Sequence, residues 1–194
     1  VLQLLGIRYY MHKKSDGRFP WAYPYWELSN YRRVWEDDHF EILENTASLP
    51  RVFLASSYVV SNSEQEILDY LFSQKTNNRE TLVLEKKPLF EPEPGEGVAT
   101  ILSYRLTEVV IETVSKVPKL LFMSDVFDKG WRSYIDDKPV ELYRADYDFR
   151  AIAVPAGTHK IRMRYRPVSV VLGMIISGTA TLIMTGFLVW KRQI

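Results

Sequence analysis

The densest group of acidic and basic side chains in the sequence is the tetrapeptide Glu36-Asp37-Asp38-His39. Neighbouring carboxylates can share acid and base roles in catalysis, or supply oxygen ligands to a divalent cation. The spacing of these residues matches no calcium-binding loop, and a strand-like segment follows at once. A solvated turn is therefore the favoured interpretation. No nucleophile stands beside a base elsewhere in the sequence, so we predict no catalytic residue in this chain.

Four side chains in the C-terminal half are candidates for ligand binding: Trp131, Arg144, Arg150 and His159. Trp131 could stack on a sugar ring, and the alternative is packing inside the domain. The two arginines could bind a phosphate or an anionic lipid, or could form ion pairs with the aspartates between positions 136 and 148. His159 follows a Pro-Ala-Gly turn, where a hydrogen-bonded structural histidine is the alternative to a functional one.

The composition argues against several kinds of site and partner. The chain has no cysteine, which excludes disulfides and thiolate metal ligands. Its three histidines, His12, His39 and His159, show no spacing typical of a zinc site. A net charge of +1 argues against nucleic-acid binding. We therefore expect no metal, no cofactor and no nucleic-acid partner for this chain.

The C-terminal segment predicts a transmembrane helix. The 23 residues from Val168 to Trp190 carry no charge, and a helix of that length is roughly 34 Å long, more than the ~30 Å hydrocarbon core of a bilayer. A helix buried in a soluble core is the alternative. Aromatic and cationic residues at both ends suit a helix anchored at two interfaces. The predicted interface residues are Arg162, Arg164, Arg166, Trp190, Lys191 and Arg192.

A stripe of small residues follows one face of this predicted helix, at Gly173, Ser177, Thr181 and Thr185. Small residues let helix backbones approach closely in lipid. The stripe therefore predicts packing against another membrane helix, with an incidental run of small residues as the alternative.

The segment from Phe19 to Trp35 holds seven aromatic residues and two prolines. Prolines at this density oppose both a helix and a central strand. We predict a long structured loop. Its aromatic side chains have three possible roles: covering the sheet, contacting the membrane interface or contacting a ligand.

The rest of the chain before the helix predicts β structure. Strand-like segments span residues 2–11, 40–44, 51–55, 81–84, 99–106, 109–114, 119–125, 134–135, 140–143, 151–154 and 159–165. For residues 2–11, the tail of a helix is the alternative. The run from Lys119 to Asp125 is largely apolar, as expected of a strand covered on both faces. Ser63, followed three residues later by Glu66, predicts the start of a short amphipathic helix from Glu64 to Gln74.

Short strands separated by turns predict a mainly β fold, an antiparallel, jelly-roll-like β-sandwich with one short helix and a C-terminal transmembrane helix. We expect an α+β portion over residues 1–90 and a sandwich portion over residues 98–167, joined as one continuous domain. The transmembrane helix then occupies residues 168–190 and a cytoplasmic tail residues 191–194.

The segment from Phe127 to Pro167, followed by an apolar helix, resembles the C-terminal end of the YfhO family of bacterial membrane proteins. The matching motifs are Gly130-Trp131, Pro139, Arg144-Ala145, Phe149-Arg150-Ala151, Pro155-Ala156-Gly157, His159 and Tyr165-Arg166-Pro167. The family usually has Asp-Gly where this chain has Asp136-Asp137. Because aspartate tolerates the left-handed conformation, we expect the turn to persist.

The resemblance implies a multi-pass membrane protein similar to GT-C glycosyltransferases, which transfer sugars from polyprenyl-phosphate donors. It implies that residues 1–167 are extracytoplasmic and that the partners are the lipid bilayer, further transmembrane helices of the same protein, and a glycan or lipid-linked sugar. Val1, in place of an initiator methionine, fits a fragment whose membrane half lies upstream. The family's catalytic acid matches no residue here. The alternative function is a single-pass, membrane-anchored carbohydrate-binding or structural module.

Overall fold

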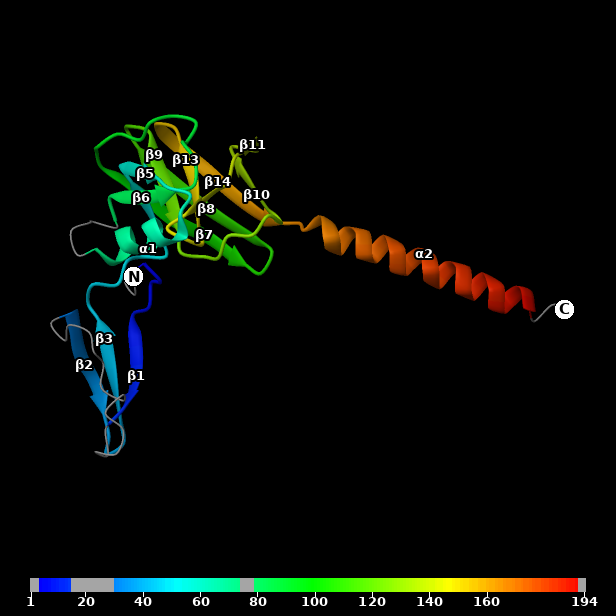
Figure 1. Ribbon diagram of the computed structural model, residues 1–194, viewed down its shortest axis with the longest axis horizontal. Helices are drawn as coiled ribbons and strands as arrows, with labels where there is room; N and C mark the ends of the chain where they lie inside the picture. The colour runs from blue at the N-terminus through cyan, green and yellow to red at the C-terminus, as the bar shows by residue number, and fades with distance from the viewer. Residues whose placement is uncertain (1–3, 15–29, 74–78, 192–194) are drawn as a thin grey trace.

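Two stacked sheets form the main body of the protein (Figure 1). The computed structural model describes residues 4–14, 30–73 and 79–191, and its first sheet has the strand order β11-β10-β14-β8-β7. These strands are β7 (Gly97–Arg105), β8 (Glu108–Ser115), β10 (Trp131–Ile135), β11 (Lys138–Val140) and β14 (Gly157–Tyr165). Each neighbouring pair is antiparallel.

The second sheet has six strands in the order β4-β9-β13-β12-β6-β5. They are β4 (Val52–Ala55), β5 (Ser57–Val60), β6 (Thr81–Leu84), β9 (Lys119–Met123), β12 (Tyr143–Ala145) and β13 (Phe149–Val154). Only the edge strand β5 runs parallel to its neighbour, β6. The predicted mainly β, antiparallel sandwich is therefore confirmed.

Apolar side chains cover both faces of the six-stranded sheet. On one face, Leu121 and Ile152 pack against Ile111 and Ile161 of the five-stranded sheet. On the other, Phe53 and Phe122 belong to a second cluster that includes Ile67 and Leu71 of helix α1 (Glu64–Phe72). All five residues of β9 are buried, which confirms the expectation for this apolar run.

Helix α1 begins where the sequence predicts. The Ser63 side chain accepts a hydrogen bond from the backbone N–H of Glu66 at 3.4 Å, as an N-cap does. The Glu66 carboxylate instead accepts from the Ser61 hydroxyl at 2.7 Å, so the reciprocal half of the capping box is absent. The helix ends at Phe72, and Gln74 lies outside the described residues.

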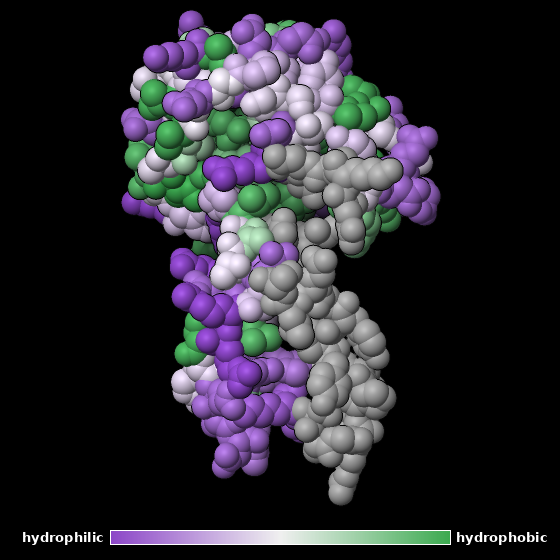
Figure 2. Space-filling view, turned by 90° about the vertical axis from the view of Figure 1, so that its left-hand side faces the viewer, coloured by the Kyte–Doolittle hydropathy of each residue, from purple (hydrophilic) through white to green (hydrophobic). Residues whose placement is uncertain are grey.

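A separate three-stranded sheet, β1-β3-β2, precedes the sandwich. Its strands are β1 (Tyr9–Lys13), β2 (Tyr31–Glu36) and β3 (Phe40–Asn45). Ion pairs such as Arg8–Glu44 at 3.0 Å cross it, and Figure 2 shows that its visible surface is largely hydrophilic. The loop prediction was therefore wrong for Tyr31 to Trp35, which form a strand, while residues 19–29 lie outside the described part.

Two strand predictions also need correction, and one strand was not predicted. The first strand begins at Tyr9 rather than Leu2, after a turn at Leu4–Gly6. The segment from Val140 to Tyr143 is divided, because β11 pairs with β10 in one sheet while β12 pairs with β13 in the other. Strand β5 was not predicted, since its four residues show no apolar alternation.

Helix α2 (Val168–Lys191) leaves the sandwich as a single long helix that ends near the C-terminus (Figure 1). Its segment from Val168 to Leu188 is long and apolar enough to cross a membrane, and none of it is buried. The predicted apolar helix is thus confirmed, and burial in a soluble core is not what the structure shows. Trp190 and Lys191 lie at its far end, and Arg192 is outside the described residues.

Candidate functional site

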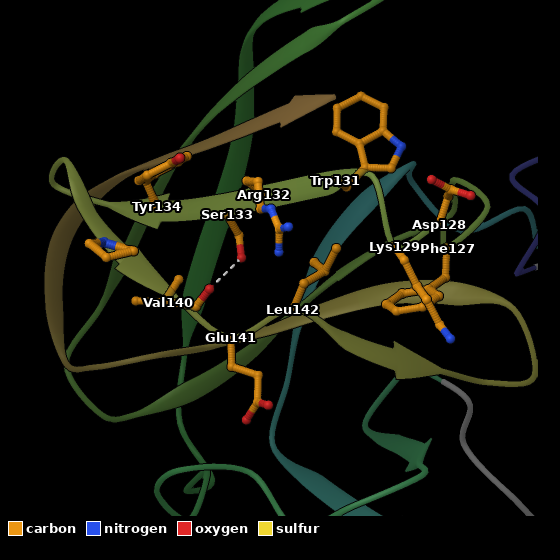
Figure 3. Close-up of a pocket in the computed structure, with 11 residues that line it drawn as sticks. Phe127, Asp128, Lys129, Trp131, Arg132, Ser133, Tyr134, Val140, Glu141 and Leu142 are labelled. Atoms are coloured by element: carbon orange, nitrogen blue, oxygen red, sulfur yellow. Dashed lines mark hydrogen bonds between the residues drawn. The ribbon is translucent and has the colours of Figure 1, made fainter. Parts of the chain in front are cut away.

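A first cavity, of about 530 Å³, lies between the β10–β11 hairpin and the loop that precedes β10. Its walls combine the aromatic rings of Phe127 and Tyr134 with charged side chains of both signs, among them Arg132 and Glu141. Figure 3 shows the Ser133 hydroxyl directed at the Val140 carbonyl, to which it donates a hydrogen bond of 2.8 Å. Aromatic faces beside polar groups suit a ligand that has both apolar faces and hydroxyl groups.

Trp131 lines this cavity, but its indole is turned away from most of the other lining side chains (Figure 3). The guanidinium carbon of Arg150 lies 3.9 Å from the indole centroid, within cation–π range. The Tyr165 ring centroid is 5.2 Å away. Trp131 therefore packs at the end of the sandwich, and Arg150 already occupies one of its π faces.

Arg150 is buried, with only 4% of its surface exposed. Its Nε donates to the Val126 carbonyl at 2.8 Å, and its Nη2 lies 4.0 Å from an Asp125 oxygen. Burial lowers the pKa of Arg150, and the Asp125 charge opposes that shift. Asp125 also accepts a hydrogen bond from the Tyr104 hydroxyl at 2.8 Å. This polar cluster closes the end of the sandwich from which α2 leaves.

Arg144 forms ion pairs at the surface. Its Nε and Nη2 donate to one Asp148 oxygen at 3.1 and 3.0 Å, and its Nη1 donates to Glu85 at 3.2 Å. The hydrogen bond to Asp148 is the main reason that the pKa of Arg144 is raised. Its guanidinium also lies 5.7 Å from the centroid of Phe127, which lines the first cavity. Arg144 therefore supports one wall of that cavity from outside.

His159 lies at a second cavity, of about 440 Å³, on the other side of β11. Its Nδ1 is 2.7 Å from an Asp136 oxygen, and its Nε2 is 3.2 Å from the Ala156 carbonyl. Because both partners are acceptors, both ring nitrogens donate in the protonated form, and the Asp136 bond raises the pKa of His159. Gly157, with φ of +132°, leaves room for the ring, since a Cβ there would lie 2.9 Å from Nε2.

The four predicted ligand-binding residues therefore do not form one site. Trp131 and Arg150 stack on each other, Arg144 contacts the outside of the first cavity, and His159 lines the second. Sequence reasoning missed Asp125, Arg132 and Tyr134. Alternation along β10 indicates that Arg132 and Tyr134 share a face, but nothing in the sequence indicates a cavity beside them.

The predicted interface arginines have different environments. Arg162 pairs with Asp137 in the β10–β11 turn, whereas Arg164 pairs with Glu108 on β8. Both turn aspartates, Asp136 and Asp137, have positive φ, which confirms that the turn persists without glycine. Among the described residues, no acidic side chain forms an ion pair with Arg166.

The small-residue stripe lies on one face of α2, and open space surrounds Gly173. The Thr181 hydroxyl donates to the Ser177 carbonyl at 2.8 Å, and Thr185 likewise donates to Thr181 within the helix. The hydroxyl groups of Thr181 and Thr185 therefore donate to carbonyl groups of their own helix. The helix face that carries them presents small side chains with no free hydroxyl donor from these two residues. Packing against another membrane helix stays a prediction.

In the tetrapeptide from Glu36 to His39, Glu36 ends β2 and the other three residues form the turn to β3. One Asp37 oxygen accepts hydrogen bonds from the backbone N–H groups of His39 and Phe40 at 2.7 and 2.6 Å. These bonds, the one from Phe40 above all, lower the pKa of Asp37. In the described part of the chain, no three potential metal ligands converge. The turn interpretation fits this geometry.

The loop before β10 contacts the residues that lead into α2. The backbone N–H of Arg166 donates to the Gly130 carbonyl at 2.7 Å. A Cβ at position 130 would lie 2.8 Å from a Tyr165 ring carbon and 3.0 Å from Pro167. Only glycine allows this close approach, so the loop before β10 is held against residues 165–167, which lead into α2.

Comparison with known proteins adds one finding to this geometry. No curated protein and no solved structure matches the chain. The family model described as bacterial membrane protein YfhO matches residues 96–177, which run from the start of the five-stranded sheet into the first half of α2. Over this segment the chain carries the sequence pattern of the bacterial membrane protein YfhO family, which confirms the resemblance.

Proposed function

We propose that this chain is the C-terminal accessory region and last transmembrane helix of a multi-pass, glycosyltransferase-like protein that transfers sugar from a polyprenyl-phosphate donor to an envelope polymer or lipid. The observation that carries the proposal is that the family match continues from β7 to Ser177 within α2. The strands from β7 to β14 and the first part of α2 thus belong to one sequence unit. In this proposal the sandwich is extracytoplasmic, and the catalytic acid belongs to another part of the protein.

In this proposal the first cavity binds the sugar. Its aromatic rings can cover the C–H faces of a pyranose, while Arg132, Asp128 and Glu141 can bond its hydroxyl groups. Through Gly130, the loop before β10 contacts Arg166, two residues before α2 begins. A sugar attached to a membrane lipid would therefore meet this cavity close to the bilayer surface.

The second candidate function is a single-pass, membrane-anchored carbohydrate-binding or structural module, with α2 as its anchor. Among the described residues, α2 is the one helix able to span a membrane. Such a module would bind sugar without contributing to transfer by a larger protein.

The chain in lipid nanodiscs is expected to bind saccharides without turning over polyprenyl-phosphate sugars. Tyr134→Ala should weaken saccharide binding about fivefold, because one aromatic contact is lost. Saturation-transfer NMR measures the binding, and release of the lipid phosphate measures turnover. Lys116→Ala, at an exposed lysine away from the cavity, is the control. Turnover that depends on a side chain within residues 4–167 would contradict the accessory role, and binding unaffected by Tyr134→Ala would exclude this cavity.

A further inference from the structure

The turn between β7 and β8 lies beside the point where the chain enters α2. The backbone N–H of Tyr165 donates to the Thr107 carbonyl at 2.9 Å. The helix begins at Val168, and three residues of extended chain span at most about 10 Å. If α2 crosses a bilayer, the turn must therefore lie at the headgroup layer.

The tip of this turn exposes a large apolar side chain. Leu106 is 96% exposed, more than any other large apolar side chain that the structure describes. A single exposed leucine is ordinary on a soluble surface. At the bilayer surface, however, it can bury its side chain at the boundary of the acyl chains. The position of Leu106 next to α2 therefore indicates contact with lipid.

A cleft of about 290 Å³ lies immediately behind this tip. Its charged side chains are Arg105, Arg164, Arg166 and Glu108. Glu108 already pairs with Arg164, and in the described part of the chain no acidic group pairs with Arg105 or Arg166. Three guanidinium groups face one carboxylate, so the cleft retains positive charge suited to a phosphate.

We propose that this cleft binds the phosphate of an anionic phospholipid headgroup, with Arg105 and Arg166 as its ligands and Leu106 inserted beside the acyl chains. Arg164, which forms an ion pair with Glu108, lines the same cleft and adds to its positive electrostatic potential. The β7–β8 turn thereby becomes a second contact with the bilayer. This second contact and the hydrogen bond between Arg166 and Gly130 together fix the tilt of the sandwich relative to the bilayer. The tilt in turn sets the height of the first cavity above the bilayer surface. The proposal requires that α2 span a bilayer and does not depend on sugar transfer or on which leaflet is involved.

The test is the environment of a polarity-sensitive fluorophore at position 106 of the full chain in nanodiscs. Leu106→Cys creates a unique labelling site, since the chain has no cysteine. Val98→Cys is the matched control, because Val98 is 62% exposed at the opposite end of β7. With phosphatidylglycerol present, the label at 106 should shift to shorter emission wavelengths and be quenched by lipids that carry a spin label near the headgroup. The label at 98 should stay in water.

Arginine substitutions identify the ligands. Arg105→Gln and Arg166→Gln should each raise the phosphatidylglycerol content needed for half of the shift, by roughly fivefold per arginine. Lys116→Gln removes an equal charge at the far end of β8 and should change little. A label at 106 that stays in water, or an equal effect of Lys116→Gln, would overturn the proposal. So would a full shift produced by inorganic phosphate in phosphatidylcholine nanodiscs, because the ligand would then be the free ion.

Discussion

Phe122→Ala is expected to cost about 3–5 kcal/mol in the free energy of unfolding of the sandwich. Phe122 is a fully buried residue of β9. Its ring stacks on Phe53 with centroids 4.7 Å apart and meets the edge of Phe149 at 5.4 Å. Removing the ring therefore leaves a cavity between the six-stranded sheet and α1 that neighbouring strands cannot fill without breaking their pairing.

Urea unfolding in detergent micelles, followed by tryptophan fluorescence, measures this loss. Phe72→Ala provides the matched control, since Phe72 is 66% exposed at the end of α1 and should change stability by less than about 0.5 kcal/mol. Equal effects of the two substitutions would mean that the layer between α1 and the sheet is not a packed core.

Asp146→Asn is expected to make the sandwich more stable than the parent at pH 8, while the two converge near pH 4. Asp146 is 1% exposed, in the turn between β12 and β13 with φ of +47°. One carboxyl oxygen accepts from the backbone N–H of Val83 at 2.7 Å. The other has no hydrogen-bond partner among the described residues. Burial raises the pKa of Asp146 to about 7, partly opposed by the Val83 bond.

The direction of the pH effect follows from this raised pKa. Below about pH 4, the Asp146 carboxyl group is protonated in both the folded and the unfolded state, so its ionisation does not lower the free energy of unfolding. Between about pH 4 and 7 the unfolded chain loses the proton while the folded protein keeps it, so stability falls as the pH rises. The full loss, about 4 kcal/mol, is reached above pH 7. Asparagine keeps the acceptor for Val83 and tolerates the left-handed backbone, but it does not ionise.

Unfolding free energies measured from pH 4 to pH 8 test this expectation. Asp136→Asn is the control, because Asp136 has a similar φ of +48° but a pKa that its His159 hydrogen bond lowers. That variant should be less stable than the parent near pH 6, and the difference should shrink as the pH falls. If Asp146→Asn leaves the pH profile unchanged, the carboxyl is not buried as described.

Local patterns in the sequence predict most of the sandwich, because each depends on residues close together in the chain. Alternation predicts β7, β8 and β14, and the apolar run predicts β9 as a strand covered on both faces. Long-range partners cannot be predicted in this way. Asp125 pairs with Arg51, which is 74 residues away, and this contact depends on how β4 and β9 align.

The buried Lys119 illustrates the same limit. Its position in an apolar strand is evident from the sequence, but its ammonium group donates to the Ser56 hydroxyl and the Gly95 carbonyl, both at 2.7 Å. These acceptors come from two remote connections. The first cavity could not be predicted either, since it forms only where the β10–β11 hairpin folds against the loop before β10.

The most direct test of the proposed architecture is the membrane orientation of the full-length protein. Cysteines introduced at Thr158, an exposed residue near the start of β14, and after Ile194 give one thiol on each side of α2. A membrane-impermeant thiol reagent is applied to intact cells, with any outer membrane permeabilised. The accessory-domain proposal predicts labelling at position 158 only. Labelling of the C-terminal cysteine alone would place the sandwich in the cytoplasm and contradict the proposal.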